Sequence, residues 1–332
     1  MTITRALLDG IRRVNRAPAV LAGVVLLTLL MALPLGMTLR GMIAGHLGDS
    51  LAAERAATGV NWEWWQEFME QASGVGVTFR PTIVGFGAVL ANVSALADKT
   101  PQVTVVAAAA TAYILVWVFL AGGVLDRYAR NRPTRAYGFF AASGVFFFRF
   151  LRLAVLAAAA YGVHYALIHP LLFERFYPWA IRDLTVERTA FVIRVLLYLV
   201  FGALLAAVNL LFDYAKVRAV VEDRRSMIGA LVSAARFAAR RPGRVAGLYL
   251  LTGVLYFAVV ALYAVLAPGA STSGWQLVGG VLIGQAYLAA RLWVKLTFYA
   301  SEVAFFQGEL AHAGYTAGPE PVWPESPAAE RL

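Results

Sequence analysis

The stretch that decides the fold is residues 6–30, with the sequence ALLDGIRRVNRAPAVLAGVVLLTLL. Its first half mixes apolar and basic residues, whereas its second half is almost entirely apolar. Pro18 lies at the junction, where a proline is tolerated in the first turn of a helix and disfavours helical geometry in the residue before it. We therefore expect a short amphipathic helix that ends near Arg16 and a long apolar helix after it.

The amphipathic half is typical of a helix that lies on a membrane surface. Arg12 and Arg16 are four residues apart, so they share one helix face, where they can reach lipid phosphates. Leu7, Ile11 and Val14 would then face the acyl boundary.

The apolar half belongs to a run over residues 17–37, which is long enough to cross a bilayer, because a spanning helix needs about 20 apolar residues. The whole chain is 60% hydrophobic and 14% charged, unlike a soluble domain. These features predict an all-α polytopic membrane protein with six transmembrane helices. The other five spans are expected at residues 102–124, 147–168, 189–211, 245–267 and 276–297.

Charged residues predict the orientation of the spans. The net charge is +10, and residues 213–244 alone carry eight basic against three acidic side chains. Residues 1–16 and 126–152 are also basic, whereas residues 39–100 carry four basic and six acidic side chains. Basic loops stay in the cytoplasm. We expect a multi-pass protein of the inner (plasma) membrane with cytoplasmic N- and C-termini, and anionic lipid rather than nucleic acid as its partner.

An internal repeat is the second signal. Residues 230–254 align with residues 6–30 at a fixed offset of 224, with ten of 25 positions identical, Pro18 and Pro242 among them. Three even-numbered spans also end in a Tyr-Ala pair at spacings of 86 and 85 residues: Tyr128-Ala129, Tyr214-Ala215 and Tyr299-Ala300. A weaker middle copy aligns Ala142, Arg149, Arg152 and Ala158 with Ala6, Arg13, Arg16 and Ala22.

The prediction is three tandem helical-hairpin repeats, each preceded by a cytoplasmic amphipathic helix. The expected boundaries are residues 1–130 for the first repeat, 131–216 for the second and 217–312 for the third. Residues 39–100 would form a long extracytoplasmic insertion in the first repeat, and residues 313–332 a disordered cytoplasmic tail.

Basic residues supply the candidate contacts with anions or lipid head groups. The repeat places Arg236 and Arg240 at the positions of Arg12 and Arg16. In the last span Arg291 and Lys295 continue a helix face that begins with Gly280, Gly284 and Tyr287. That face can serve close helix packing with snorkelling side chains, or it can bind an anion or a head group.

The outer insertion contains an aromatic segment, Asn61 to Glu70. As a helix it would gather Trp62, Trp65 and Met69 on one face, which predicts either an interfacial helix or a platform for a protein partner. Residues 81–97 are apolar but short for a span, so we expect a second interfacial or re-entrant piece.

No catalytic constellation, cofactor motif or metal site is expected. The chain has no cysteine, and it contains no HExxH, phosphate-binding loop or nucleophile elbow. His164 and His169 are five residues apart, a poor spacing for one metal ion. Asn209, within the fourth span, is expected to bond another helix.

The sequence thus favours a non-catalytic assembly or accessory component that organises lipid or partner proteins. The alternative is a permease for an anionic or amphipathic solute along the pseudo-threefold axis of the repeats. In that case Arg291 and Lys295 would lie at its cytoplasmic end.

Overall fold

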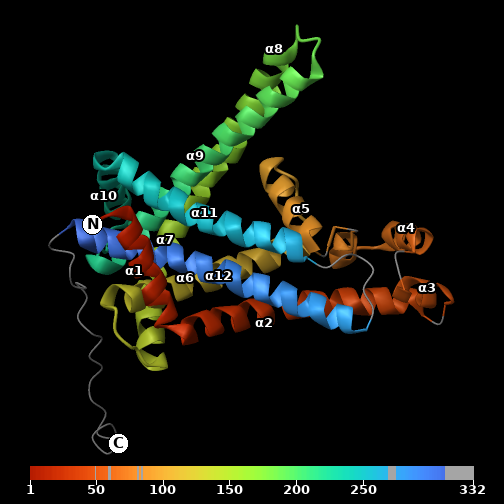
Figure 1. Cartoon of the computed structure of the whole chain (residues 1–332), viewed down its shortest axis with the longest axis horizontal. Helices are drawn as coiled ribbons and strands as arrows, with labels where there is room; N and C mark the ends of the chain where they lie inside the picture. Colours follow the sequence, from red (N-terminus) through yellow and green to blue (C-terminus); the bar gives the residue numbers. More distant parts are fainter. Residues whose placement is uncertain (49, 59–60, 81, 84, 268–273, 311–332) are drawn as a thin grey trace, which may run out of the picture. The chain divides into compact units, whose positions relative to one another are not determined.

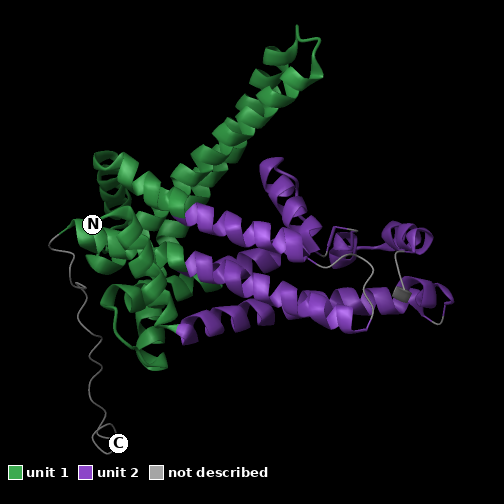
Figure 2. Ribbon diagram, viewed as in Figure 1, with its two compact units in different colours: residues 1–17, 116–251, 297–332 green, residues 18–115, 252–296 purple. Residues whose placement is uncertain are grey.

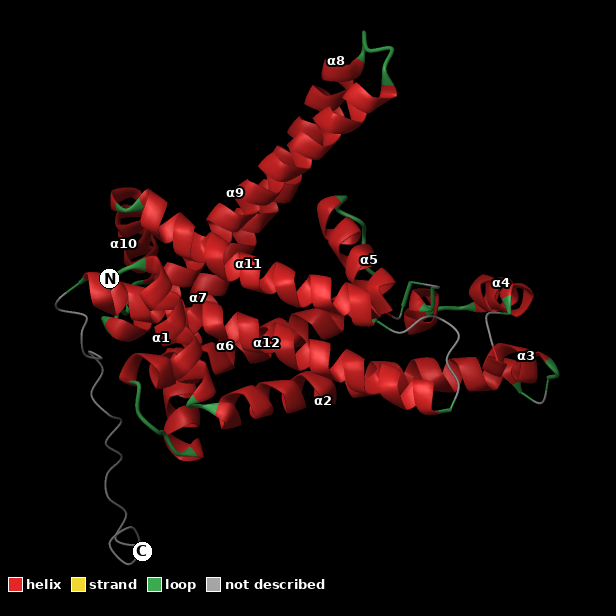
Figure 3. Ribbon diagram, viewed as in Figure 1, coloured by secondary structure: helices red, strands yellow, loops and turns green. Residues whose placement is uncertain are grey.

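The computed structural model describes the chain except residues 49, 59–60, 81, 84, 268–273 and 311–332. Every regular element within the described residues is a helix (Figures 1 and 3). In the described part of the chain, six helical segments are long and apolar enough to cross a membrane, which confirms the multi-pass membrane class. They are α2 (Pro18–Leu47), α6 (Thr104–Arg130), the segment from α7 to α8 (Ala136–Ile181), α9 (Glu187–Val221), α11 (Pro242–Leu266) and α12 (Trp275–Glu309).

Each predicted span coincides with one of these helices, and several helices extend well beyond it. Helices α9 and α12 have 35 residues each, or about 52 Å, so they are longer than the roughly 30 Å hydrocarbon core of a bilayer. Their ends therefore reach into the polar layer, where charged side chains are tolerated. The segment from α7 to α8 contains two π-helical stretches, η2 (His164–Ile168) and η3 (Leu171–Phe176).

The chain divides into two compact units (Figure 2). Unit 1 comprises residues 1–17, 116–251 and 297–332, and unit 2 comprises residues 18–115 and 252–296. In unit 1, α10 (Met227–Arg240) packs on α7 and α9. The core of unit 1 includes Phe237. The centroid of its ring lies 5.4 Å from that of Tyr214 and 5.1 Å from that of Phe306.

Unit 2 contains the predicted insertion. The insertion forms α3 (Ala52–Thr58), α4 (Trp62–Gln71), the 3-10 helix η1 (Gly74–Thr78) and α5 (Gly85–Ala97). Helix η1 packs on α2 so closely that a Cβ at Gly76 would lie 2.7 Å from the Met42 methyl group. The hydroxyl groups of Thr28 and Tyr113 lie 3.1 Å apart and link α2 to α6.

The expectation of an amphipathic helix before every hairpin is wrong for the second hairpin. Helices α1 (Ile3–Asn15) and α10 are separate elements, each followed by a break and a proline at the start of the next helix. Helix α7 (Ala136–Val163) instead runs without interruption. Ala154 occupies the position that corresponds to Pro18 and Pro242, so nothing forces the helix to end there.

The first part of the predicted insertion is helical. Residues 39–47 continue α2, and this stretch contains no proline that would interrupt the helix. The predicted tail, residues 313–332, lies outside the described residues, as does most of the turn between α11 and α12. The threefold repeat itself stays a prediction.

Candidate functional site: an arginine-lined cavity at α10

Helix α10 carries most of the candidate site, and its small buried residues determine how it packs. The Ser226 hydroxyl group accepts a hydrogen bond from the Gly229 amide at 3.2 Å and caps the first turn. One face, formed by Ala230, Ala234 and Phe237, is buried. The small alanines let α10 approach its neighbours, and Arg236 and Arg240 lie beside the buried face and are exposed.

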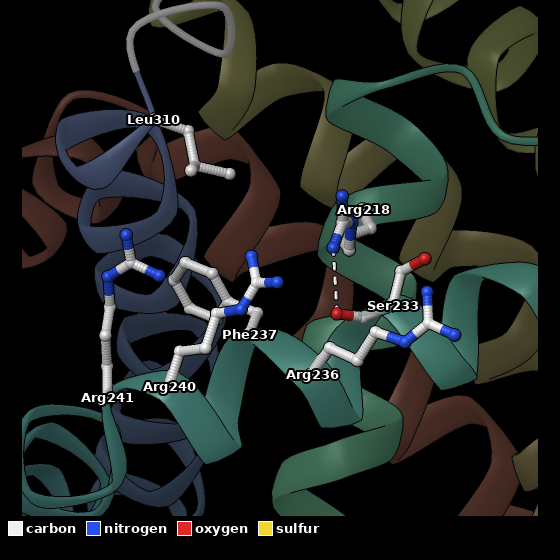
Figure 4. A pocket seen from close by; sticks show the side chains of 7 residues that line it. All are labelled: Arg218, Ser233, Arg236, Phe237, Arg240, Arg241 and Leu310. Atoms are coloured by element: carbon white, nitrogen blue, oxygen red, sulfur yellow. Dashed lines mark hydrogen bonds between the residues drawn. The ribbon is translucent and has the colours of Figure 1, made fainter.

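A cavity of about 490 Å³ opens beside this face (Figure 4). Four arginine side chains reach it from α9, from α10 and from the residue after α10, together with a serine, a phenylalanine and a leucine. The lining residues are Arg218, Ser233, Arg236, Phe237, Arg240, Arg241 and Leu310. The cavity is therefore strongly basic.

Two of the four arginines are already engaged. Arg218 donates two hydrogen bonds to the Glu222 carboxylate, at 3.1 and 2.8 Å, and one to the Ser233 carbonyl oxygen at 2.8 Å. Arg241 donates to Glu309 at 3.1 Å and lies over the Phe237 ring at 4.9 Å. These contacts hold the walls of the cavity in place.

The other two arginines are free to bind. Arg236 and Arg240 are exposed, and no side chain in the described part of the protein forms an ion pair or hydrogen bond with their guanidinium groups. A guanidinium group matches the geometry of a phosphate and can bind it through two parallel hydrogen bonds. The sequence predicted this pair, but not the engaged arginines beside it.

Helix α1 repeats the arrangement. Arg12 and Arg16 are exposed, and the described residues again offer their guanidinium groups no acidic partner. Arg13, between them, is buried and donates to Asp9 at 3.0 Å, to the Tyr128 carbonyl oxygen at 2.7 Å and to Gln307 at 2.9 Å. Val14 is buried in the protein, so the expectation that it faces lipid is wrong.

The basic residues of the last span do not line a cavity of this kind. Arg291 is exposed and Lys295 is half-buried. Neither lines the cavity at α10 or the cavity at α4 described below. A Cβ at Gly284 would meet no described atom within 4 Å, so close helix packing at this glycine is not observed. Tyr287 instead stacks on Tyr263 at 4.0 Å and joins α12 to α11.

In the predicted insertion, the aromatic helix is present as α4, and it also has a buried face that was not predicted. Trp62 is 51% exposed and stacks on Trp65 at 4.6 Å, while Met69 is half-buried. The buried face is Trp64 and Phe68, and the Trp64 indole donates to His46 Nδ1 at 3.0 Å.

Sequence reasoning missed the buried face because the tryptophans at positions 62 and 65 dominated the pattern. The packing leaves a cavity of about 290 Å³ that carries charges of both signs. Its lining residues are His46, Ser50, Ala52, Arg55, Asn61, Glu63, Trp64 and Glu67.

The two histidines of the third span belong to an aromatic cluster. Both are buried, and their rings lie 4.6 and 5.4 Å from that of Phe201. Within the described residues, no group of three or more His, Cys, Asp or Glu side chains could hold a metal ion.

Asn209 bonds other helices, as expected. Its amide nitrogen donates to the Tyr249 hydroxyl group at 3.0 Å, and its amide oxygen accepts from Tyr161 at 3.3 Å. The same amide nitrogen donates to Asp213, which begins a buried charged cluster that sequence reasoning did not single out. The available signal was Asp213 and Lys216 at three-residue spacing, directly after the apolar run of α9.

Comparisons of the chain with known protein families, with curated protein sequences and with solved structures give no match. We therefore infer function from the arrangement of the side chains.

Proposed function

We propose that the chain is a non-catalytic accessory or assembly component of an inner membrane that holds anionic phospholipid head groups at its cytoplasmic face. The binding groups are the arginine pairs Arg12/Arg16 on α1 and Arg236/Arg240 on α10. The observation that carries the proposal is the contrast within the cavity at α10. Arg218 and Arg241 are ion-paired there, whereas the exposed Arg236 and Arg240 have no acidic partner among the described residues.

The position of the pairs in the chain supports this role. Each pair lies at the end of an amphipathic helix, directly before the proline that begins a spanning helix. Guanidinium groups at such a position would lie at the level of the head groups on the basic side of the membrane, which supports the proposal. An anionic leaflet attracts each nearby basic side chain by about 1 kcal/mol, so four such residues form a substantial binding surface.

Equivalent burial in α1 and α10 supports the repeat prediction and a common role for the two helices. Ala6, Gly10 and Arg13 are buried in α1, and the corresponding Ala230, Ala234 and Phe237 are buried in α10. The tyrosines of the three Tyr-Ala pairs, Tyr128, Tyr214 and Tyr299, are all buried as well.

We assign the binding of a protein partner to the outer insertion, through the exposed edge of α4. A photo-crosslinking residue at position 62 should give a specific adduct in native membranes. The same residue at lipid-facing Leu30 should not give that adduct, and identical products at both positions would remove this part of the proposal.

The orientation is tested with single cysteines, since the natural chain has none. Arg225→Cys should be protected from an impermeant thiol reagent in intact cells, and Gln66→Cys should be labelled, because both side chains are exposed. The reverse pattern would overturn the orientation.

Lipid binding is tested by thermal unfolding in nanodiscs. The melting temperature should be higher in discs that contain an anionic phospholipid than in purely zwitterionic discs. Arg236→Ala combined with Arg240→Ala should reduce that difference and leave the value in zwitterionic discs unchanged. Arg175→Ala with Arg188→Ala removes the same charge from exposed positions at the predicted outer side. This control should keep the full difference, and an equal loss in both variants would contradict a specific site.

The permease alternative has less support, because neither cavity described above contains Arg291 or Lys295. It would gain support if a soluble anion raised the melting temperature of the wild type but not of a variant with alanine at both positions.

A further inference from the structure

A buried charged cluster lies in unit 1, where side chains of α9 and α12 meet. The Lys216 ammonium group lies 2.5 Å from the Asp213 carboxylate and donates to the Tyr299 hydroxyl group at 3.3 Å. Asp213 also accepts a hydrogen bond from Asn209 at 3.0 Å. Asp213, Lys216 and Tyr299 therefore form a connected set in which each polar group has a partner.

Glu302 is the exception in this cluster. It follows Tyr299 by three residues on α12, so both side chains share one helix face. Glu302 is 2% exposed, and no described residue donates a hydrogen bond to either of its carboxylate oxygens. The charged groups that act on it are Asp213 and Lys216 of α9. Phenol groups face it from three helices: Tyr214 of α9, Tyr249 of α11 and Tyr299 of α12.

The charges of this cluster do not balance when every group is ionised. Asp213 and Glu302 would carry two negative charges and Lys216 one positive charge, which is already held by Asp213 and Tyr299. An ionised carboxylate that is buried without a partner costs folding free energy. Breaking a buried ion pair by removing one of its members is strongly destabilising for the same reason. One added positive charge would restore neutrality.

We propose that Glu302 is a proton-binding site, occupied at neutral pH, whose proton balances the charge of the Asp213–Lys216 pair. The proton is preferred over a metal ion, since Glu302 lies in no group of three or more His, Cys, Asp or Glu side chains that could hold one in the described residues. Loss of the proton would place an uncompensated charge between α9 and α12, so occupancy of the site is linked to the packing of these helices. This inference does not rest on the binding of lipid.

The direct test is infrared spectroscopy of the purified full chain in nanodiscs at neutral pH. A protonated carboxyl group absorbs at a higher frequency than an ionised one, and the band shifts in heavy water. The wild type should show such a band, and Glu302→Gln should lack it. Glu222→Gln is the matched control, because the Glu222 side chain is only 7% exposed but is paired with Arg218 and Arg224. This variant should keep the band. Persistence of the band in Glu302→Gln, or its absence from the wild type, would overturn the proposal.

Thermal unfolding gives a second readout that does not need the spectroscopic band. The folded protein keeps a proton that the unfolded chain releases at neutral pH, so the melting temperature of the wild type should fall as the pH rises. Glu302→Gln imitates the protonated form and should fold, with a smaller fall over the same range. Failure of Glu302→Gln to fold, while the wild type is insensitive to pH, would overturn the proposal.

A further experiment, which varies the sodium concentration, distinguishes a bound proton from a bound metal cation. At constant ionic strength, replacement of choline by sodium should leave the melting temperature unchanged. A sodium-dependent rise that disappears in Glu302→Gln would show that the site binds a metal cation instead.

Discussion

Helices α1 and α10 occupy corresponding places in the chain and differ in how they are anchored. Both bury small residues on the inner face, and both expose two arginines four residues apart. Arg13 anchors α1 through hydrogen bonds to the Tyr128 carbonyl oxygen and to Gln307. At the corresponding position of α10, Phe237 packs on the rings of Tyr214 and Phe306.

The difference shows which features are needed for packing and which are not. A polar and an aromatic side chain both anchor a helix beside a Tyr-Ala pair, so the chemistry of the buried position can change. The exposed arginine pair is present in both helices, although within the described residues neither pair has an acidic partner. Packing therefore does not explain the pair, and we propose that the binding of anionic head groups does.

The largest effect is expected for the aromatic anchor. Phe237→Ala should lower the free energy of unfolding by about 3–5 kcal/mol, because it removes a buried ring and leaves a cavity. Chemical denaturation in detergent micelles measures this loss. Phe191 is 67% exposed, and Phe191→Ala should have little effect. Equal effects of the two substitutions would show that α10 does not rely on Phe237.

The polar anchor should contribute less. Arg13→Met should lower the free energy of unfolding by about 2–3 kcal/mol, since a methionine cannot bond the Tyr128 carbonyl oxygen, Asp9 or Gln307. The same measurement on Arg12→Met is the control, because Arg12 is the exposed neighbour. A loss at position 12 as large as that at position 13 would contradict the distinction between anchor and exposed pair.

A smaller effect is expected where α1 passes α12. A Cβ at Gly10 would lie 2.6–2.7 Å from the Ser301 backbone nitrogen, Cα and Cβ atoms. Gly10→Ala should therefore cost about 1–3 kcal/mol through overpacking, measured as a fall in melting temperature. Gly23→Ala should not destabilise the protein, because a Cβ at Gly23 has no described neighbour within 4 Å. A stable Gly10→Ala variant would mean that α1 is not held against Ser301.

The helices could be predicted from sequence because lipid imposes a strong and simple pattern. A run of about 20 apolar residues has few other structures available to it. The ends of the two amphipathic helices α1 and α10 could also be predicted, from Pro18 and Pro242. In the middle copy, Ala154 stands at the corresponding position and lets the helix continue, which the alignment alone did not indicate. A weak alignment therefore predicts an element less well than the residue that would break or continue it.

The candidate site could be predicted only in part. Arg236 and Arg240 follow from helical spacing, which the sequence shows directly. Arg218 and Glu309 reach the same region from other helices, and their ion pairs depend on tertiary contacts. Glu302 was not recognised as a site, because burial and the lack of a hydrogen-bond donor are properties of the packed helices.

Native mass spectrometry of the protein released from anionic membranes tests the central claim most directly. The wild type should retain anionic phospholipid in preference to zwitterionic phospholipid. Conversion of Arg12, Arg16, Arg236 and Arg240 to alanine should abolish that preference while the protein stays folded. Retention of the same anionic lipids by the folded quadruple variant would contradict the account.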